Sequence, residues 1–263
     1  MPPRDNDLVA LVTGAARGIG AETVRQLAKQ GYRILAVDSC EGTETPYPLP
    51  NPDELAAVAE PFGDRVRTAI IDVRDRDALS AAVSEHVDLW GTLDVAVAAA
   101  AVIRGGNSLW ETPSTDLDLL IDVDVKGVWN TAAVAVPHML AAPDPARCRF
   151  VAVASAAGST GMFHLAAYNV AKHGVIGLVR GLAADLAGTG VTACAVSPGS
   201  TGTAMLSATA EIYQVSIEEL IGHQSLRRPL TVGELAATIA FACSDAGAVL
   251  NGSVVSADGG FAA

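Results

Sequence analysis

The sequence is poor in several kinds of residue, and each shortage excludes a class of protein. Only 17% of its 263 residues are charged and 5% are aromatic, while half are apolar. Such a chain can bury a large core, which excludes an intrinsically disordered protein. Basic residues are scarce, since 17 Lys and Arg face 29 Asp and Glu for a formal net charge of −12. Because phosphate backbones are bound by basic surfaces, no nucleic-acid partner is expected.

Signals for disulfides, secretion and membrane insertion are also missing. The four cysteines are isolated, without a C-x-x-C pair: Cys40, Cys148, Cys194 and Cys243. Such spacing is typical of buried thiols in a reducing compartment, so we expect neither a disulfide framework nor a metal site. Residues 1–7 lack the basic-then-apolar pattern of a signal peptide, and the longest apolar runs, 95–103 and 131–136, are too short to cross a bilayer. A cytoplasmic protein without a membrane partner is expected.

Short β-rich runs alternate with longer amphipathic stretches along the chain. Seven runs are predicted as strands: Leu8–Val12, Arg33–Val37, Arg67–Ile71, Leu93–Ala98, Phe150–Ala154, Val191–Val196 and Ser253–Ser256. Six stretches are predicted as helices: Ala21–Gln30, Pro52–Glu60, Asp75–Trp90, Ser114–Leu140, Ala166–Ala187 and Val232–Ser244. Near-continuous apolar strands suit a parallel sheet covered on both faces. The alternation predicts a single α/β domain over residues 1–263, a Rossmann-type doubly wound sheet.

Two segments interrupt this alternation. Residues 39–51 contain three prolines, Pro46, Pro48 and Pro50, which exclude a regular helix or a central strand. They are predicted to form an ordered insertion loop. Residues 199–229 follow a strand end without containing a strand, and we expect a lid with one or two helices there, over an active site.

A glycine-rich turn, Thr13–Gly20 (TGAARGIG), links the first expected strand to the first helix. Glycines allow a tight turn, a close approach of the backbone to a pyrophosphate and close packing of helix on strand. The glycines alone are a weak signal, since ordinary turns also contain them, but their position indicates a dinucleotide site. The candidate contacts are Gly14, Arg17, Gly18, Ile19 and Gly20.

Carboxylates at the ends of the next two strands extend this site. Asp38 stands near the offset at which a carboxylate hydrogen-bonds the adenosine ribose, and it would repel a 2′-phosphate. It therefore favours NAD over NADP, although Arg17 could attract that phosphate. The alternative is a solvated acid at a strand end. Asp72-Val73 closes the third strand, where the carboxylate could accept from the adenine amino group.

Ser155, Tyr168 and Lys172 form the candidate catalytic group. Ser155 follows the fifth expected strand, and the spacing of four places Tyr168 and Lys172 on one face of the next helix. A phenol with a pKa near ~10 is a poor base at neutral pH, and an adjacent ammonium lowers that pKa. Tyr168 is thus the expected proton donor or acceptor, Ser155 would hold the substrate oxygen, and Lys172 could also reach the nicotinamide ribose.

Together these motifs resemble the short-chain dehydrogenase/reductase family over nearly the whole chain. TGAARGIG matches TGxxxGxG, and Ser155, Tyr168 and Lys172 match the family's Ser and YxxxK. Pro198-Gly199 followed by Thr203 matches PGxxxT, whose Thr binds the nicotinamide carboxamide. The resemblance implies a seven-stranded parallel sheet and a homotetramer or homodimer, of which we expect the homotetramer.

The sequence departs from the family pattern at two places. The NNAG after strand four is here Ala98–Ala101, which leaves Ala98 as a candidate beside the cofactor and puts the local geometry in doubt. Asp124 stands where the family usually has an Asn that holds a water in a proton relay with Lys172. We predict that Asp124 keeps the relay but raises the pKa of Tyr168 and so the pH optimum. A catalytically neutral substitution is the alternative.

Tyr47–Leu55 resembles the insertion of mycofactocin-coupled, carveol dehydrogenase-like members of actinobacteria. That resemblance implies an NAD that does not exchange, trapped by a loop over its adenosine end and reoxidised by an external redox carrier. The alternative is a surface loop that binds nothing.

Three segments are expected to line the substrate pocket: 101–109, 156–165 and 200–226. Their side chains are mainly apolar: Val102, Ile103, Met162, Phe163, Leu165, Met205, Leu206 and Ile212. His164 and His223 are weaker candidates. An NAD-dependent enzyme acting on a small apolar secondary alcohol or ketone is expected. A 3-oxoacyl-thioester reductase, which would prefer NADPH, and a non-catalytic dinucleotide sensor or scaffold are the alternatives.

Overall fold

The computed structural model describes residues 8–40, 42, 45 and 47–261. Two expectations concern residues outside this part: the missing signal peptide in residues 1–7, and Pro46 of the insertion loop.

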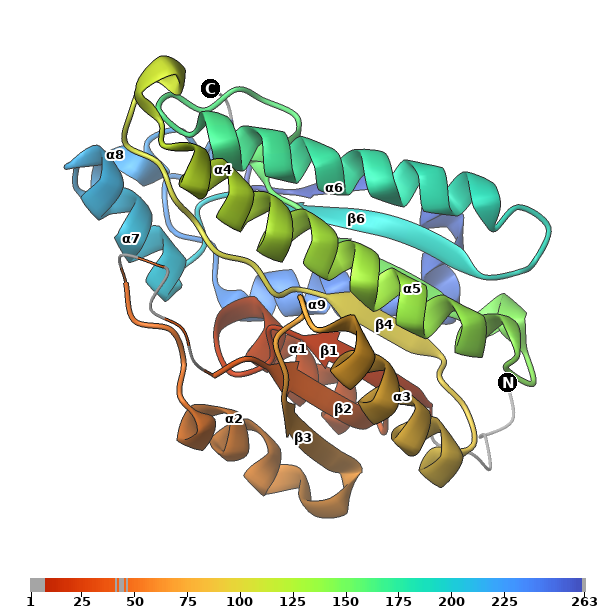
Figure 1. Cartoon of the computed structure of the whole chain (residues 1–263). Coiled ribbons are helices and arrows are strands. Elements are labelled where there is room, and N and C mark those ends of the chain that lie inside the picture. Colours follow the sequence, from red (N-terminus) through yellow and green to blue (C-terminus); the bar gives the residue numbers. More distant parts are fainter. Residues whose placement is uncertain (1–7, 41, 43–44, 46, 262–263) are drawn as a thin grey trace.

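Seven parallel strands form one continuous sheet, in the order β3-β2-β1-β4-β5-β6-β7 (Figure 1). The strands are β1 Val9–Thr13, β2 Arg33–Asp38, β3 Val66–Ile70, β4 Val95–Ala98, β5 Arg149–Val153, β6 Thr192–Pro198 and β7 Val254–Ala257. The predicted doubly wound, Rossmann-type sheet is confirmed, and the bounds of its strands differ from the prediction by one or two residues. The strand order reverses between β1 and β4, and ligands of such sheets bind outside the carboxyl ends of the strands at this point.

Helices cover both faces of the sheet (Figure 1). They are α1 Gly18–Lys29, α2 Pro52–Ala59, α3 Arg76–Trp90, α4 Ser114–Leu120, α5 Gly127–Leu140, α6 Ala166–Asp185, α7 Ala204–Tyr213, α8 Ile217–Ile221 and α9 Val232–Cys243. Helices α3, α5 and α6 bury apolar side chains against one face, and α1, α2 and α9 do so against the other. Burial on both faces explains why the central strands are apolar at nearly every position.

The predicted helix over Ser114–Leu140 is not regular along its length. A π-helical turn, Ile121–Lys126, joins α4 to α5 and contains the buried residue Asp124. Such a turn fits one extra residue into a helix and is frequent at functional sites. The predicted helix over Ser114–Leu140 therefore continues through this turn. Its π-helical form was not predicted, because one extra residue in a helix leaves no distinct mark on the apolar pattern around it.

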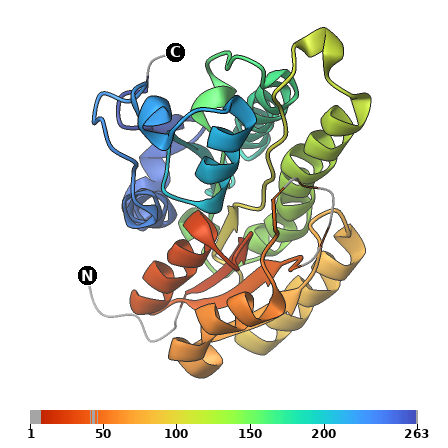
Figure 2. The same cartoon turned by 90° about the vertical axis from the view of Figure 1, so that its left-hand side faces the viewer.

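The two irregular segments lie at the carboxyl edge of the sheet. The described part of 39–51 contains neither helix nor strand and ends at Asn51, whose side chain accepts from the Glu54 amide in a capping box that starts α2. The expected lid contains α7 and α8, and a bridge between Thr201 and Leu230 joins its two ends. Seen from this edge, α7 and α8 lie over the end of the sheet (Figure 2).

Buried polar side chains fasten the opposite, amino edge. Asp94, directly before β4, accepts a 2.9 Å hydrogen bond from the Val9 amide that begins β1. Arg149 begins β5 and is 3% exposed. Its guanidinium donates to the carbonyls of Ser244, at the end of α9, and Ala146. These bonds satisfy backbone groups that the ends of the elements would otherwise leave without partners.

Within the described residues, no helix is both long and apolar enough to cross a membrane. The same part of the chain holds no group of three His, Cys, Asp or Glu placed to bind a metal ion. All four cysteines are buried, and no disulfide joins them in the described part of the chain.

Candidate active site

The glycine-rich turn between β1 and α1 is closed so tightly that side chains do not fit. Gly14 has a φ of +67°, and a Cβ there would lie 2.6 Å from the backbone nitrogen of Ala100. A Cβ on Gly20 would overlap the carbonyl oxygen of Gly14. Gly18 also has a positive φ, of +62°. The turn therefore brings the N-terminus of α1 to the crevice beside β1, where its amides can bind a phosphate.

Asp38 holds this turn from the neighbouring strand. One oxygen of its carboxylate accepts from the Ala16 amide at 3.0 Å, and the other accepts from the Cys40 amide at 3.2 Å. The carboxylate lies on the wall of the adjoining cavity. It retains acceptor capacity for ribose hydroxyls, because each carboxylate oxygen can accept more than one hydrogen bond.

Asp72 is engaged more fully than the sequence suggested. Arg74 donates to one of its oxygens through two guanidinium nitrogens, at 2.6 and 2.9 Å. Burial raises the pKa of Asp72, but the hydrogen bonds and charge of Arg74 outweigh burial, so its pKa lies below the ordinary value. The pair lies on the cavity wall, where Arg74 occupies part of the carboxylate that was expected to accept from an adenine amino group.

One cavity of ≈ 960 Å³ joins the glycine turn to the candidate catalytic residues. Fourteen of the sixteen predicted site residues line it: Gly14, Arg17, Gly18, Ile19, Gly20, Asp38, Asp72, Val73, Ser155, Tyr168, Lys172, Pro198, Gly199 and Thr203. Among the described residues, Ala98 and Asp124 are the two predicted ones that lie behind this wall. Ala98 ends β4 and is buried in the core, and the next residues, 99–103, form the wall.

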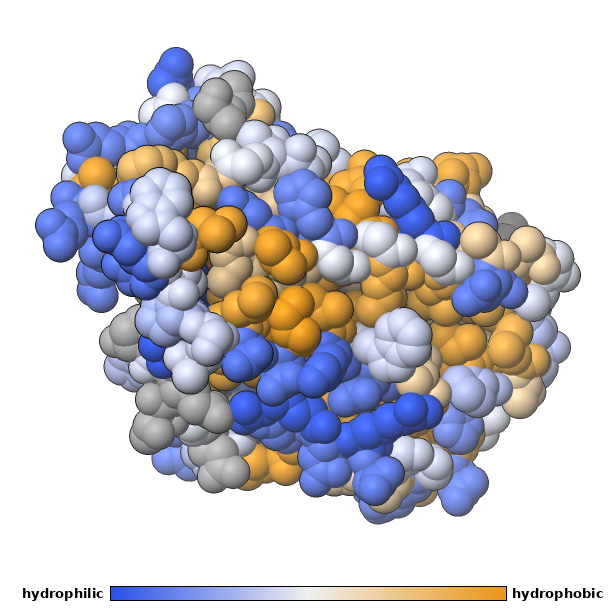
Figure 3. Space-filling view, turned by 45° about the horizontal axis from the view of Figure 1, so that its top comes forward, coloured by the Kyte–Doolittle hydropathy of each residue, from blue (hydrophilic) through white to orange (hydrophobic). Residues whose placement is uncertain are grey.

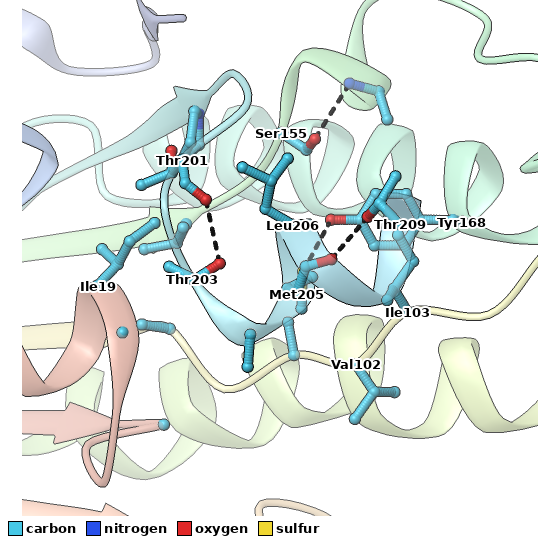
Figure 4. Close-up of a pocket in the computed structure, with 18 of the residues that line it drawn as sticks. Ile19, Val102, Ile103, Ser155, Tyr168, Thr201, Thr203, Met205, Leu206 and Thr209 are labelled. Carbon is cyan, nitrogen blue, oxygen red and sulfur yellow. Dashed lines mark hydrogen bonds between the residues drawn. The ribbon is translucent and has the colours of Figure 1, made fainter. Parts of the chain in front are cut away.

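Tyr168 and Lys172 lie one helical turn apart on α6, both almost fully buried. The Lys172 ammonium is 5.4 Å from the centre of the Tyr168 ring. Ser155 follows β5, and its hydroxyl accepts from the Ala157 amide at 3.2 Å. The Tyr168 hydroxyl reaches the cavity, where it contacts the sulfur of Met205 at 3.9 Å (Figure 4). The structure thus brings the three predicted catalytic side chains to one end of the cavity.

Asp124 acts on this group from behind the wall. It is fully buried, with one carboxylate oxygen 3.1 Å from the Lys172 nitrogen. The other oxygen accepts a 2.8 Å hydrogen bond from the Val102 amide. The π-helical turn directs Asp124 toward α6, so it holds both Lys172 and the wall segment that follows β4.

The charges around Tyr168 oppose one another. Burial raises the pKa of the phenol, the Lys172 ammonium lowers it and the Asp124 carboxylate raises it, leaving the pKa above its ordinary value. Burial lowers the pKa of Lys172, but the charges of Asp124 and Tyr168 raise it by more. The pKa therefore lies above its ordinary value, and the lysine keeps its proton. A buried anion paired with Lys172 thus weakens the effect of that lysine on the phenol.

Tyr47 is a site residue that the sequence analysis placed only in an insertion. The Ile103 amide donates to its hydroxyl at 3.0 Å, and the Arg17 guanidinium lies 5.9 Å from its ring centre. Burial raises the pKa of Tyr47 to about 12, so the phenol is neutral. The insertion therefore reaches beyond the adenosine end and connects the glycine turn to the wall beside Tyr168. An aromatic residue among prolines was the signal for an anchoring side chain.

The expected substrate pocket is the part of the cavity around Tyr168. Its walls carry most of the predicted apolar residues: Val102, Ile103, Met162, Phe163, Leu165, Met205 and Leu206. Ile212 packs beside them rather than on the described wall. Of the two candidate histidines, His223 lines the described cavity and His164 does not. The His164 ring stacks on Phe163 with ring centres 3.7 Å apart.

Comparison with known proteins gives consistent matches over nearly the full length. A family model described as enoyl-(acyl carrier protein) reductase matches residues 14–262. A (−)-trans-carveol dehydrogenase of Rhodococcus erythropolis is 37% identical over 216 residues, which cover 80% of this chain and 77% of the relative. A cis-4-hydroxycyclohexanecarboxylate dehydrogenase of Sinomonas cyclohexanicum is 32% identical over 97% of this chain and 96% of its own. The crystal structure of carveol dehydrogenase from Mycobacterium avium in complex with NAD has a TM-score of 0.91 and 30% identity, with 98% and 99% of the two chains covered.

Proposed function

The chain belongs to the short-chain dehydrogenase/reductase family, and on that premise we propose that it is an NAD-dependent dehydrogenase that interconverts an apolar secondary alcohol and its ketone. One observation carries this proposal. The buried pair Tyr168 and Lys172 opens into the same cavity as the glycine turn and Asp38, so a proton donor and a dinucleotide site share one space.

The residues of the turn fit a dinucleotide. Neighbouring backbone atoms fill the space that side chains at positions 14 and 20 would need. The turn therefore packs closely and leaves the amides of α1 open to a pyrophosphate. We assign the cofactor to the predicted residues on the cavity wall other than Ser155. Asp38 supports NAD over NADP, because a 2′-phosphate would meet its carboxylate. The NAD complex of the Mycobacterium avium relative supports the same choice.

The chemistry assigned to this chain is a proton transfer beside a hydride transfer. A bound nicotinamide would supply the hydride acceptor for oxidation of the alcohol and the hydride donor for reduction of the ketone. Tyr168 takes the hydroxyl proton in oxidation and gives it back in reduction. Ser155 donates a hydrogen bond to the reacting oxygen, and Lys172 stabilises the phenolate. Asp124 positions Lys172 and keeps it charged.

An apolar substrate is supported by the walls around Tyr168, where aliphatic and thioether side chains outnumber charged ones. Two relatives are named for alcohols, carveol and a hydroxycyclohexanecarboxylate. The alternative of a 3-oxoacyl-thioester reductase would require a preference for NADPH, which Asp38 opposes.

Within the proposed homotetramer, apolar side chains exposed on helices α4, α5 and α6 support one of the interfaces between copies. These include Leu117, Trp129, Leu140 and Val170, which are between 39% and 61% exposed. Figure 3 shows an apolar band across this face. Large apolar patches on soluble proteins are typical of protein interfaces, and a second copy of this chain is the proposed partner.

The proposed chemistry is tested by Tyr168→Phe, which removes the proton donor and keeps the ring. Turnover of carveol and cyclohexanol, measured with NAD and an artificial electron acceptor that can reoxidise retained NADH, should fall by about 10²–10⁴-fold. NAD binding, measured by calorimetry, should change little because the phenyl ring remains. Undiminished turnover in the variant would remove Tyr168 as the proton donor. Binding of NAD without turnover in the parent would favour a non-catalytic dinucleotide sensor.

A further inference from the structure

The side chain of Met205 contacts the hydroxyl group of Tyr168 inside the cavity. Its sulfur is 3.9 Å from the Tyr168 oxygen, on the cavity side of the phenol (Figure 4). Met205 is the second residue of α7, and its carbonyl accepts a 2.7 Å hydrogen bond from Thr209 one turn later. Its backbone is thus fixed on the lid while its side chain reaches the catalytic residues.

A thioether is a poor acceptor for a phenol proton. Sulfur accepts hydrogen bonds weakly, whereas a carbonyl or alcohol oxygen accepts them well. The Tyr168 hydroxyl that contacts Met205 carries the proton that the proposed reaction exchanges with substrate. The substrate oxygen must therefore take the position beside Tyr168 that the sulfur now holds.

We propose that substrates enter by displacing the Met205 side chain from Tyr168, and that Met205 thereby determines which alcohols the enzyme accepts. This inference rests on the proposed dehydrogenase function. Methionine is suited to such a role, because its three rotatable bonds and polarisable sulfur let it repack against different surfaces. Met205 is partly exposed, so the side chain has room to move.

Displacement favours substrates with a large apolar surface. Moving the thioether away breaks its packing against Tyr168 and the neighbouring apolar residues. A six-membered ring can replace these contacts against Val102, Ile103 and the displaced methionine. A substrate with only methyl groups beside its carbinol carbon replaces few of them, because the gain grows with the apolar area buried.

Substrate preference provides the first test. The ratio of kcat/KM for cyclohexanol to that for 2-propanol should fall about tenfold in Met205→Ala, because the small alcohol no longer has to displace a side chain. Met205→Leu keeps most of the bulk and should preserve the ratio within about threefold. Met162→Ala is the matched control, since Met162 also lines the cavity, and its ratio should change less than that of Met205→Ala.

Displacement itself is observable by NMR of methionine methyl groups labelled with ¹³C. The chain has four methionines, and Met205→Leu identifies the signal of Met205. In protein loaded with NAD⁺, saturating cyclohexanone should shift that signal, because this pair binds without reacting. Met139 is fully buried in the core and serves as the internal reference.

Two results would overturn the inference, and they separate it from the proposed function. Turnover of cyclohexanol together with an unmoved Met205 signal, or with an unchanged preference in Met205→Ala, would remove the role of Met205 and leave the dehydrogenase assignment standing. If the parent enzyme oxidised neither alcohol and neither alcohol nor cyclohexanone bound, the proposed function would fail and the inference with it.

Discussion

At the scale of single residues, the site is dominated by a carboxylate that the family pattern does not contain. Asp124 is buried without contact to the cavity and touches Lys172 and the Val102 amide. An asparagine could donate and accept at the same place without a charge. The aspartate adds a negative charge behind Lys172, and its main chemical effect falls on the neighbouring phenol.

Asp124→Asn should shift the pH dependence of alcohol oxidation to lower pH. The Asp124 anion raises the pKa of Tyr168, so the neutral amide should lower that pKa and let the phenolate form at lower pH. In profiles of kcat/KM the acidic limb of oxidation should move down by about one pH unit, equivalent to about 1.4 kcal/mol. Ketone reduction requires the neutral phenol and should lose activity at a correspondingly lower pH.

Asp122→Asn is the control for this measurement. Asp122 lies on the same π-helical turn but pairs with Lys126 at the surface. Its variant should keep the profile of the parent. An unchanged profile in Asp124→Asn would make the substitution at position 124 catalytically neutral, the alternative left open by the sequence.

At the scale of elements, the β1–α1 turn requires glycine at positions where a Cβ atom would overlap the backbone. Gly20→Ala should destabilise the protein by about 1–3 kcal/mol, because its Cβ overlaps the Gly14 carbonyl oxygen. NAD affinity should fall as the turn shifts. Unfolding in urea and calorimetric titration with NAD measure the two effects.

At Gly177, in the middle of α6, substitution by alanine should stabilise the protein instead. At Gly177 no described atom outside its own helix backbone lies within 4 Å of the place that an alanine methyl group would take, so Ala fits freely. Gly177→Ala should stabilise the protein by about 0.5–1 kcal/mol and leave NAD affinity unchanged. If Gly20→Ala and Gly177→Ala changed stability and NAD affinity equally, the close contact at Gly20 would not be a requirement of the turn.

The inserted segment should slow the exchange of NAD. Tyr47 joins the Ile103 amide and the Arg17 guanidinium across the cavity. Protein purified without added cofactor should therefore release about one equivalent of NAD on denaturation. Tyr47→Ala should release NAD about tenfold faster, equivalent to about 1.4 kcal/mol. Tyr47→Phe keeps the ring over Arg17 and should fall between the two.

Protein that purifies without NAD yet turns over with added NAD would exclude trapping and the narrower, mycofactocin-coupled assignment. The broader dehydrogenase assignment would remain. Retention of NAD would also require an external redox carrier to reoxidise it between turnovers.

The sequence predicts the elements better than the contacts between them. Strands buried on both faces are continuous apolar runs, and YxxxK on a helix places two side chains together by periodicity alone. The π-helical turn at Ile121–Lys126 was missed because a single extra residue inside a helix has no apolar pattern of its own. Met205 was predicted to line the substrate pocket, but its contact with Tyr168 was not predicted, and neither was the place of Tyr47. Segments without a repeating pattern are placed by tertiary packing.

At the scale of the whole molecule, the exposed face of α4, α5 and α6 predicts association. Light scattering on the purified protein should give a homotetramer. Trp129→Glu places a charge in the apolar band, where Trp129 is 61% exposed, and should reduce the assembly to smaller species. Leu89→Glu alters a similarly exposed residue on α3 and should leave the assembly intact. A monomeric parent protein would exclude this interface.

The parallel sheet places contacts that stabilise the fold at one edge and the residues of the proposed reaction at the other. At the amino edge, Asp94 and Arg149 tie strands and helix ends together, whereas the proposed chemistry gathers at the carboxyl edge. Effects of substitutions that are far apart and share no partners are generally additive. Laboratory evolution can therefore first select stabilising substitutions at the amino edge. Substitutions in the substrate pocket that cost stability can then be selected independently.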